Sequence, residues 1–157
     1  MDNYIVGIGE VLWDHFEDKD NYVLGGAPFN FAYHVNQFGL NSLVISAIGN
    51  DKLGQKLEAD VKEKNVPYML EHLNLPTGVV NIKEIDGKPR YDILTERAWD
   101  HIPNTEKLKE IATSIHIKKN NEYNLVYGNK NGGSNKYNSY ILQAQFFYCR
   151  YTEILLL

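Results

Sequence analysis

Four residues near the start of the chain combine short polar side chains with glycine backbone: Asp14, Gly25, Gly26 and Asn30. The Asp14 carboxylate can accept two hydrogen bonds, and the Asn30 amide can both donate and accept. Glycine has no Cβ, so the backbone at Gly25 and Gly26 can approach a ligand closely. Short polar groups on rigid elements suit a small ligand that presents several hydrogen-bonding groups.

Each of these residues also has a simpler interpretation when taken alone. Asp14 can start a turn, Gly25-Gly26 can form a loop, and Asn30 can lie on a helix surface. Their combination at these spacings favours a binding role. Asp51 is predicted to be a helix N-cap rather than a ligand, because aspartate is common at that position.

Other kinds of site find little support. Gly7-Ile8-Gly9 lacks the third glycine of a dinucleotide fingerprint, and no G-x-x-x-x-G-K-[ST] loop occurs. The five histidines show no metal spacing, and Cys149 has no cluster of ligands around it. We therefore predict no metal site and no cofactor site in this chain. Arg90 and Arg97 could reach a substrate, although exposed charges of this kind are more often solvated.

Net charge indicates which partners are not expected, and the cysteine count indicates the cellular compartment. The net charge is −4, so neither nucleic acid nor an anionic membrane is an expected partner. A single cysteine excludes an internal disulfide and fits a reducing cytoplasm. Met1 to Tyr4 carries an acid where a signal peptide would be basic, and the apolar Ile154 to Leu157 is too short to span a bilayer. We expect a cytoplasmic protein.

The first third of the chain alternates between strand and helix signals. Tyr4 to Trp13 is predicted to be one buried strand, followed by a turn and short strands over His15 to Leu24. Ala27 to Phe38 is predicted to be a helix, with Pro28 in its first turn and Gly39 after its end. Phe31, Val35 and Phe38 recur along it at helical spacing.

The next segments extend this alternation. Ser42 to Ile48 is a compact strand signal, and the helix that Asp51 would cap carries an apolar stripe of Leu53, Leu57 and Val61. The order strand, helix, strand, helix, strand indicates βαβ units and a parallel sheet. Val79 to Ile85 and Arg90 to Leu94 flank Asp86-Gly87, which predicts a hairpin appended outside that sheet. Thr105 to Ile115 is predicted to be a short helix.

The composition changes near residue 115. Residues 116–157 contain seven asparagines and six tyrosines but no aspartate, and 129–135 is low in complexity. We predict a boundary there, with 1–115 as one unit and 116–157 as an atypical tail that is disordered or translated out of frame. A genuine short variant with a diverged tail is the alternative.

The segment Gly25 to Ala32, followed by Gly39 and Gly49, resembles the N-terminal signature of the ribokinase-like (PfkB-type) carbohydrate kinases. Gly7 to Asp14 resembles the opening strand of the fructokinase branch. The stretches that extend this resemblance over about residues 4–115 are Gly49 to Gly54, Pro76 to Gly78 and Ala98 to Pro103.

The resemblance implies an α/β fold: a three-layer sandwich with a parallel-rich central sheet and a small β lid, here truncated. It implies that Asp14, Gly25, Gly26 and Asn30 bind a sugar, with fructose favoured. Lid segments at about 15–24 and 79–94 would close over the sugar and exclude water, and in many members the lid mediates a homodimer. ATP and Mg²⁺ are implied as cofactors of a complete family member.

In this family the catalytic aspartate belongs to a G-A-G-D-type motif of the C-terminal half, and the 157 residues contain no such motif. We therefore expect a fructokinase-like protein whose chain holds the sugar-binding half and has no kinase activity alone, because the base and the anion hole are both missing. The alternative is a non-catalytic protein that binds sugar or a partner through its lid.

Overall fold

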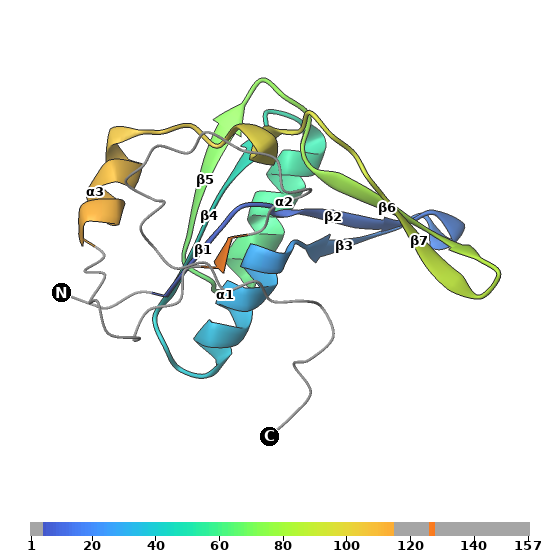
Figure 1. Cartoon of the computed structure of the whole chain (residues 1–157), viewed down its shortest axis with the longest axis horizontal. Helices are drawn as coiled ribbons and strands as arrows, with labels where there is room; N and C mark the ends of the chain where they lie inside the picture. The colour runs from blue at the N-terminus through green and yellow to red at the C-terminus, as the bar shows by residue number, and fades with distance from the viewer. Residues whose placement is uncertain (1–4, 115–125, 128–157) are drawn as a thin grey trace.

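Two four-stranded sheets organise the computed structural model, which describes residues 5–114 and 126–127 (Figure 1). The main sheet is entirely parallel, with strand order β5-β4-β1-β8. Its strands are β1 (Ile5–Ile8), β4 (Ser42–Gly49), β5 (Tyr68–Leu73) and β8 (Val126–Tyr127). The predicted βαβ alternation is confirmed.

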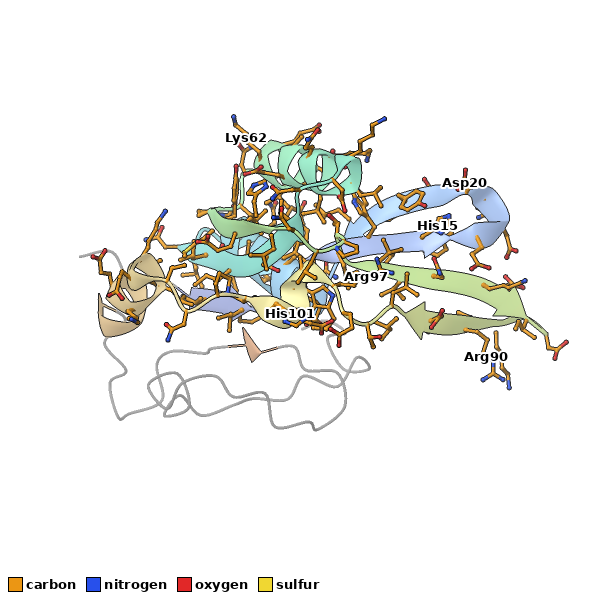
Figure 2. The ribbon with its side chains drawn as sticks, turned by 90° about the horizontal axis from the view of Figure 1, so that it is seen from above. His15, Asp20, Lys62, Arg90, Arg97 and His101 are labelled. Carbon is orange, nitrogen blue, oxygen red and sulfur yellow. The ribbon has the colours of Figure 1, made fainter. Side chains whose placement is uncertain are left out.

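Helical segments cover both faces of the main sheet. They are α1 (Ala27–Gln37), α2 (Lys52–Glu63), η2 (Ala98–His101) and α3 (Glu106–Ser114). On β4, Val44 and Ile48 belong to the core that includes residues of α1 and α2, whereas Ile45 and Ala47 belong to the core under η2 and α3. Figure 2 shows α2 above the sheet, with η2 and α3 below it. The predicted three-layer α/β arrangement is confirmed.

A second sheet, which we call the lid sheet, projects to one side of the main sheet (Figure 1). Its order is β3-β2-β6-β7, and its central pair β2 and β6 is parallel. Its strands are β2 (Leu12–Phe16), β3 (Asn21–Gly25), β6 (Val79–Ile85) and β7 (Lys88–Ile93), with the short helix η1 (Glu17–Lys19) between the first two. Asp86 and Gly87 turn between β6 and β7 with φ of 52° and 69°. These positive angles fit the tight hairpin predicted there.

The prediction of one strand over Tyr4 to Trp13 is wrong. The strand ends at Ile8, Gly9 has a φ of 138°, and the chain enters the lid sheet at Leu12. The apolar run is continuous because both strands are buried, so hydrophobicity does not record the change of sheet. Asp14 consequently lies within β2 and not at the end of a main-sheet strand.

Helix α1 runs almost as predicted, but its buried face differs from the predicted stripe. Pro28, Phe29 and Ala32 are the buried residues, and Phe38 is 83% exposed. The predicted stripe of Phe31, Val35 and Phe38 therefore does not mark the packed side. In α2, Leu57 and Val61 are fully buried, as predicted.

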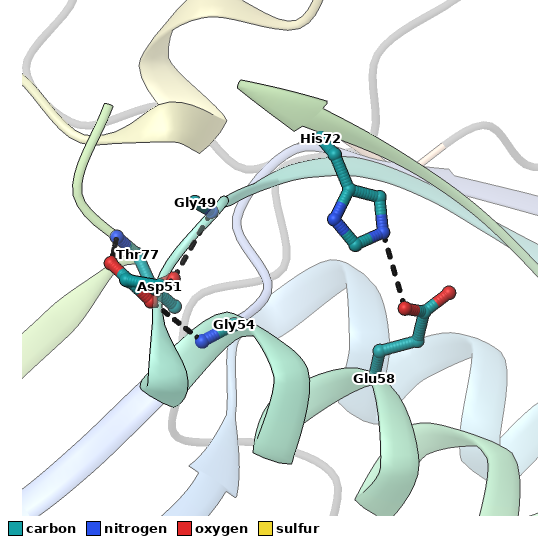
Figure 3. A network of polar contacts seen from close by, with 6 residues as sticks. All are labelled: Gly49, Asp51, Gly54, Glu58, His72 and Thr77. Carbon is teal, nitrogen blue, oxygen red and sulfur yellow. Dashed lines mark hydrogen bonds and ion pairs between the residues drawn. The ribbon is translucent and has the colours of Figure 1, made fainter. Parts of the chain in front are cut away.

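Asp51 begins α2 and also ties it to the connection after β5 (Figure 3). Its Oδ1 accepts bonds from the Gly54 amide (2.7 Å) and the Thr77 hydroxyl (2.6 Å), and its Oδ2 accepts from the Thr77 amide (2.9 Å). The Thr77 hydroxyl in turn accepts from the Gly49 amide (3.0 Å). Burial opposes ionisation, but these hydrogen bonds outweigh it and hold the pKa of Asp51 below its usual value. The predicted N-cap is confirmed.

Trp13 joins the base of the lid sheet to α2. Its indole is fully buried, and Nε1 donates to the Leu53 carbonyl at 3.0 Å. The Lys56 ammonium lies 4.0 Å from the centre of its ring system, and Tyr22 packs edge-on at 6.3 Å. The lid sheet is thus fixed to the main body at its root.

The predicted tail lies outside the described residues except at Val126–Tyr127. These two residues pair in parallel with Gly7 and Ile8 of β1. The boundary near residue 115 stays a prediction.

We expect Thr77→Val to lower the free energy of unfolding by about 1–3 kcal/mol, because the buried Gly49 amide and Asp51 carboxylate each lose a partner. Chemical denaturation of the 157-residue chain measures this. Thr95→Val, at an exposed position, is the matched control and should change stability by less than about 0.5 kcal/mol. Equal effects at both positions would show that the network in Figure 3 contributes nothing.

Candidate functional site

The sequence-predicted residues gather at the carboxyl end of β1, where the chain leaves the main sheet for the lid sheet. Ligands of open α/β sheets bind beyond the carboxyl ends of the strands, at points where neighbouring connections diverge. Here the β2–β3 hairpin projects away from this edge, and α1 starts directly after the hairpin. The candidate site therefore lies where the end of β1, the hairpin and the start of α1 meet.

Asp14 and Gly25 are in direct contact. In the β2–β3 hairpin, Leu12 is paired with Gly25, and the Asp14 side chain lies over the glycine. A Cβ at Gly25 would be 2.3 Å from Asp14 Oδ2, so only glycine leaves room for this carboxylate. Asp14 is half-buried, and burial raises the pKa of its carboxyl group.

Gly26 is the N-cap of α1 and links the hairpin to Asn30. Its φ is 109°, and a Cβ there would be 2.2 Å from the Glu10 carbonyl oxygen. The backbone amide of Asn30 donates a hydrogen bond to the Gly26 carbonyl at 2.9 Å, as in the regular first turn of a helix. The Asn30 side chain is half-buried. Gly25 and Gly26 thus satisfy the packing of the chain itself, a reason that differs from the close approach to a ligand predicted from the sequence.

Glu10 is a residue of this region that the sequence analysis did not select. The backbone amides of Glu10 itself and of Ala27, at the start of α1, lower the pKa of its carboxyl group, but by less than burial raises it. Its Oε2 is buried and has no hydrogen-bond partner within the described residues. Burial raises the pKa of Glu10, and the negative charge of Asp100 raises it further. The available signal was an ionisable residue within the apolar run of Tyr4 to Trp13.

His15 stiffens the lid sheet beside Asp14 (Figure 2). Its Nδ1 lies 3.1 Å from the Asn81 side-chain oxygen on β6, and its Nε2 lies 3.0 Å from Asp20. The ring stacks on Tyr22 with centroids 4.2 Å apart. The hydrogen bond with Asn81 and the nearby acids, of which Asp20 is one, raise the pKa of His15.

The two arginines considered from the sequence lie in different places (Figure 2). Arg90 is exposed on β7, opposite Lys83 of β6. Arg97 is half-buried at the start of η2, where its Nε is buried without a hydrogen-bond partner in the described part of the chain. Of the two, only Arg97 lies near the root of the lid sheet.

The described ranges, 5–114 and 126–127, hold no group of three or more His, Cys, Asp or Glu side chains placed to bind a metal ion. The same residues include no helix long and apolar enough to cross a membrane.

We expect Gly26→Ala to lower the free energy of unfolding by at least about 2 kcal/mol, because it adds left-handed strain and a clash with the Glu10 carbonyl. Gly39→Ala is the matched control: Gly39 also has a positive φ of 75°, but nothing lies within 4 Å of its Cβ position. It should cost about 1 kcal/mol. Thermal and chemical unfolding measure both variants, and equal losses would argue against the close approach at Gly26.

No protein-family model matches the chain. In sequence it is 28% identical over 123 residues to an ATP-dependent 6-phosphofructokinase of Thermoanaerobacterium thermosaccharolyticum. The aligned region covers 72% of this chain and 38% of that relative. It is 27% identical over 106 residues to the uncharacterized sugar kinase PH1459 of Pyrococcus horikoshii. This alignment covers 60% of this chain and 34% of that protein. The chain thus spans well under half the length of these two relatives.

Solved structures show the same relationship in the fold. The crystal structure of PH1459 matches with a TM-score of 0.64 at 24% identity, over 80% of this chain and 43% of that one. The fructokinase of Xylella fastidiosa with bound ATP matches with a TM-score of 0.63 at 20% identity, over 80% of this chain and 39% of that one. The chain therefore has the fold of the ribokinase-like (PfkB-type) sugar kinases and is related in sequence to proteins of that family.

Proposed function

We propose that this chain is the sugar-binding part of an ATP-dependent sugar kinase, with fructose as the sugar. The observation that carries the proposal is the half-buried Asp14 carboxylate, seated on Gly25 beside the start of α1. Among the proteins of similar fold are the fructokinases of Xylella fastidiosa and Halothermothrix orenii, which support fructose as the substrate. An ATP-dependent relative and structures with bound ATP support the phosphoryl donor.

In this proposal the described residues bind and orient the acceptor sugar. The Asp14 carboxylate accepts hydrogen bonds from two sugar hydroxyls, and the Asn30 side chain bonds a neighbouring hydroxyl from the first turn of α1. The lid sheet covers the sugar and keeps water from competing for the phosphoryl group. ATP supplies that group when it is bound in a complete enzyme.

The 157-residue polypeptide by itself is proposed to bind sugar without phosphorylating it. Calorimetry with fructose, paired with an assay of ATP-dependent fructose phosphorylation, tests both parts. Heat of binding without turnover is the expected result. Turnover above a blank without protein would show that the chain holds a complete active site, and absence of binding would overturn the proposed function. The cytoplasmic location expected from the sequence stays a prediction.

We expect Asp14→Asn to weaken fructose binding by about tenfold or more, since hydrogen bonds to a charged acceptor contribute about 1.5–3 kcal/mol. Asp92→Asn, at an exposed position of the same sheet, is the control and should bind as the unchanged chain does. Calorimetry measures both affinities. Equal affinity of the Asp14 variant and the control would remove Asp14 from the site.

The same Asp14→Asn variant should be as stable as the unchanged chain, or more stable, at neutral pH. The folded-state pKa of Asp14 is raised by burial, so folding favours the protonated form and the ionised form opposes folding. The contribution of Asp14 to the free energy of unfolding is therefore most favourable below the unfolded-state pKa, and it is lost as pH rises through the folded-state pKa. Unfolding measured across acid and neutral pH should show the advantage of the variant only at the higher pH.

A second function, association through the lid sheet, is favoured by the face that carries Asp14. Strand register places Val23, Asp14 and Val80 in one row across that face. Phe16, Ile82 and Tyr91 form the next row. Phe16, Val23 and Tyr91 are 37%, 45% and 64% exposed, so an apolar surface lies beside the carboxylate. We propose that a second copy of the chain covers it.

We expect Tyr91→Lys to weaken self-association by about tenfold or more, because it places a charge in an apolar interface. Phe38→Lys is the control, since Phe38 is 83% exposed but lies at the far end of α1. Sedimentation equilibrium over a range of concentrations measures the association. A chain that stays monomeric throughout, before any substitution, would overturn the dimer.

A further inference from the structure

The His15 side chain connects four segments of the lid sheet (Figure 2). Its Nε2 lies 3.0 Å from a carboxylate oxygen of Asp20, the residue that ends η1. Its Nδ1 lies 3.1 Å from the side-chain oxygen of Asn81 on β6. The ring also stacks on Tyr22 of β3, with an angle of 11° between the two ring planes. One side chain on β2 therefore contacts β3, β6 and the end of η1.

Both ring nitrogens of His15 face oxygen atoms. A neutral imidazole has one N–H donor and can satisfy only one of these two acceptors, whereas the imidazolium donates to both. The arrangement therefore fits the protonated ring. The surroundings act in the same direction: the hydrogen bond with Asn81, followed by the acids Asp20 and Glu17, raises the pKa of His15 above its ordinary value of 6.5, although burial opposes the charge.

The two acceptors of His15 differ in their exposure to water. The Asp20 side chain is 88% exposed and that of His15 is 17% exposed, so water screens the ion pair on this side of the ring. Asn81 is half-buried, and strand register places Asp92 of β7 on its other side. An acceptor there favours an Asn81 amide that turns its NH₂ group toward β7 and its oxygen toward His15.

The cations of this face lie farther from the His15 ring than its acceptors do. Lys83 and Arg90 form the next row of the lid sheet, two positions along β6 and β7. Lys56 of α2 lies 4.0 Å from the ring centre of Trp13, two positions before His15. The groups in direct contact with the imidazole therefore favour its charge.

The contact between His15 and Asn81 lies next to the proposed sugar ligand. Asp14 pairs with Val80 and His15 pairs with Asn81, so two consecutive pairs of one parallel ladder carry the carboxylate and this contact. The same ladder joins the β2–β3 hairpin to the β6–β7 hairpin. The hydrogen bond from His15 therefore holds the two hairpins of the lid sheet together beside Asp14.

We propose that His15 is a positioning residue whose protonated ring fastens the β2–β3 hairpin to β6 and η1 and so holds Asp14 in place for the sugar. The role in sugar binding rests on the proposed function, whereas the charge on the ring belongs to the folded chain without ligand. Because the folded-state pKa of His15 is raised, its stabilising effect is complete below the ordinary value of 6.5. The effect is lost as pH rises through the folded-state pKa, and the lid sheet loosens.

The first arm of the test follows the imidazole resonances of the 157-residue chain by NMR across pH, without ligand. The His15 resonance, assigned by its absence from the His15→Gln variant, should titrate above 6.5. Asn81→Leu removes the acceptor on β6 and should lower the pKa of His15. Asp20→Asn removes the charge at an exposed position and should lower it as well, since asparagine also tolerates the positive φ of 44° there.

His72→Gln is the control of this arm, because His72 pairs with Glu58 on the edge strand of the main sheet and should leave the His15 titration unchanged (Figure 3). A His15 pKa at or below 6.5 in the unchanged chain overturns the proposal, since Asn81 would then present its NH₂ group to a neutral ring. That outcome does not depend on the folding of any variant. An unmoved pKa in folded Asn81→Leu also overturns it.

The second arm measures fructose affinity by calorimetry from about pH 6 to about pH 9, the range in which a histidine with a raised pKa loses its proton. Ionisation of Asp14 favours binding in every variant that retains it, so His15→Gln supplies the baseline. Relative to that baseline, the affinity of the unchanged chain should fall about threefold across the His15 titration, as for the loss of a partly exposed ion pair. His72→Gln should follow the unchanged chain.

The two arms separate the proposal from the function on which it rests. Identical pH profiles of affinity in the unchanged chain and in His15→Gln overturn the positioning role. Asn81→Leu should lose its affinity at lower pH than the unchanged chain, a shift that a purely structural defect would not produce. An unchanged chain that binds no fructose at any pH overturns the proposed function, and the titration then still decides whether the folded chain holds His15 in its charged form.

Discussion

The burial of the Trp13 indole is the constraint on which the arrangement of the two sheets depends. The ring lies in the core shared with α1 and α2, and its nitrogen is held by the Leu53 carbonyl. Because Trp13 is the second residue of β2, this contact fixes the lid sheet at its root, next to Asp14. A fully buried tryptophan is among the most expensive side chains to displace, so the root does not move independently of α2.

The root of the lid sheet and its exposed face differ in how tightly their residues are packed. At the root, Gly25 lies against the Asp14 carboxylate and Gly26 lies against the Glu10 carbonyl, with little room for variation at either position. Farther out, the same face carries apolar side chains with partial exposure, which suits contacts that form only when a ligand or a partner is present. A half-buried carboxylate surrounded by apolar residues binds hydroxyl groups more strongly than one in open water, because the local dielectric constant is lower.

Local sequence signals predicted the helices and the lid hairpin, because each depends on few residues. Pro28 and Gly39 bracket α1, Asp51 starts α2, and Asp86-Gly87 turns between β6 and β7. The break after Ile8 was missed because burial on both sides keeps the run apolar. Glu10 was missed because the residue against which its backbone packs, Gly26, is sixteen positions away in the sequence, and no periodic pattern reports such a contact. The contact between Asp14 and Gly25 follows from hairpin register, which the residue types alone do not determine.

The parallel pairing of β2 with β6 has a consequence for how the chain folds. The hairpin that carries Asp14 is local, but its inner neighbour arrives only after α1, β4, α2 and β5 have been made, and His15 and Asn81 are 66 positions apart. Closing such a long loop is an entropic cost that must be met before the pairing stabilises anything. During synthesis, therefore, the first hairpin would leave the ribosome with the outer edge of β2 still unpaired, and the lid sheet would acquire its final shape only once β6 had emerged.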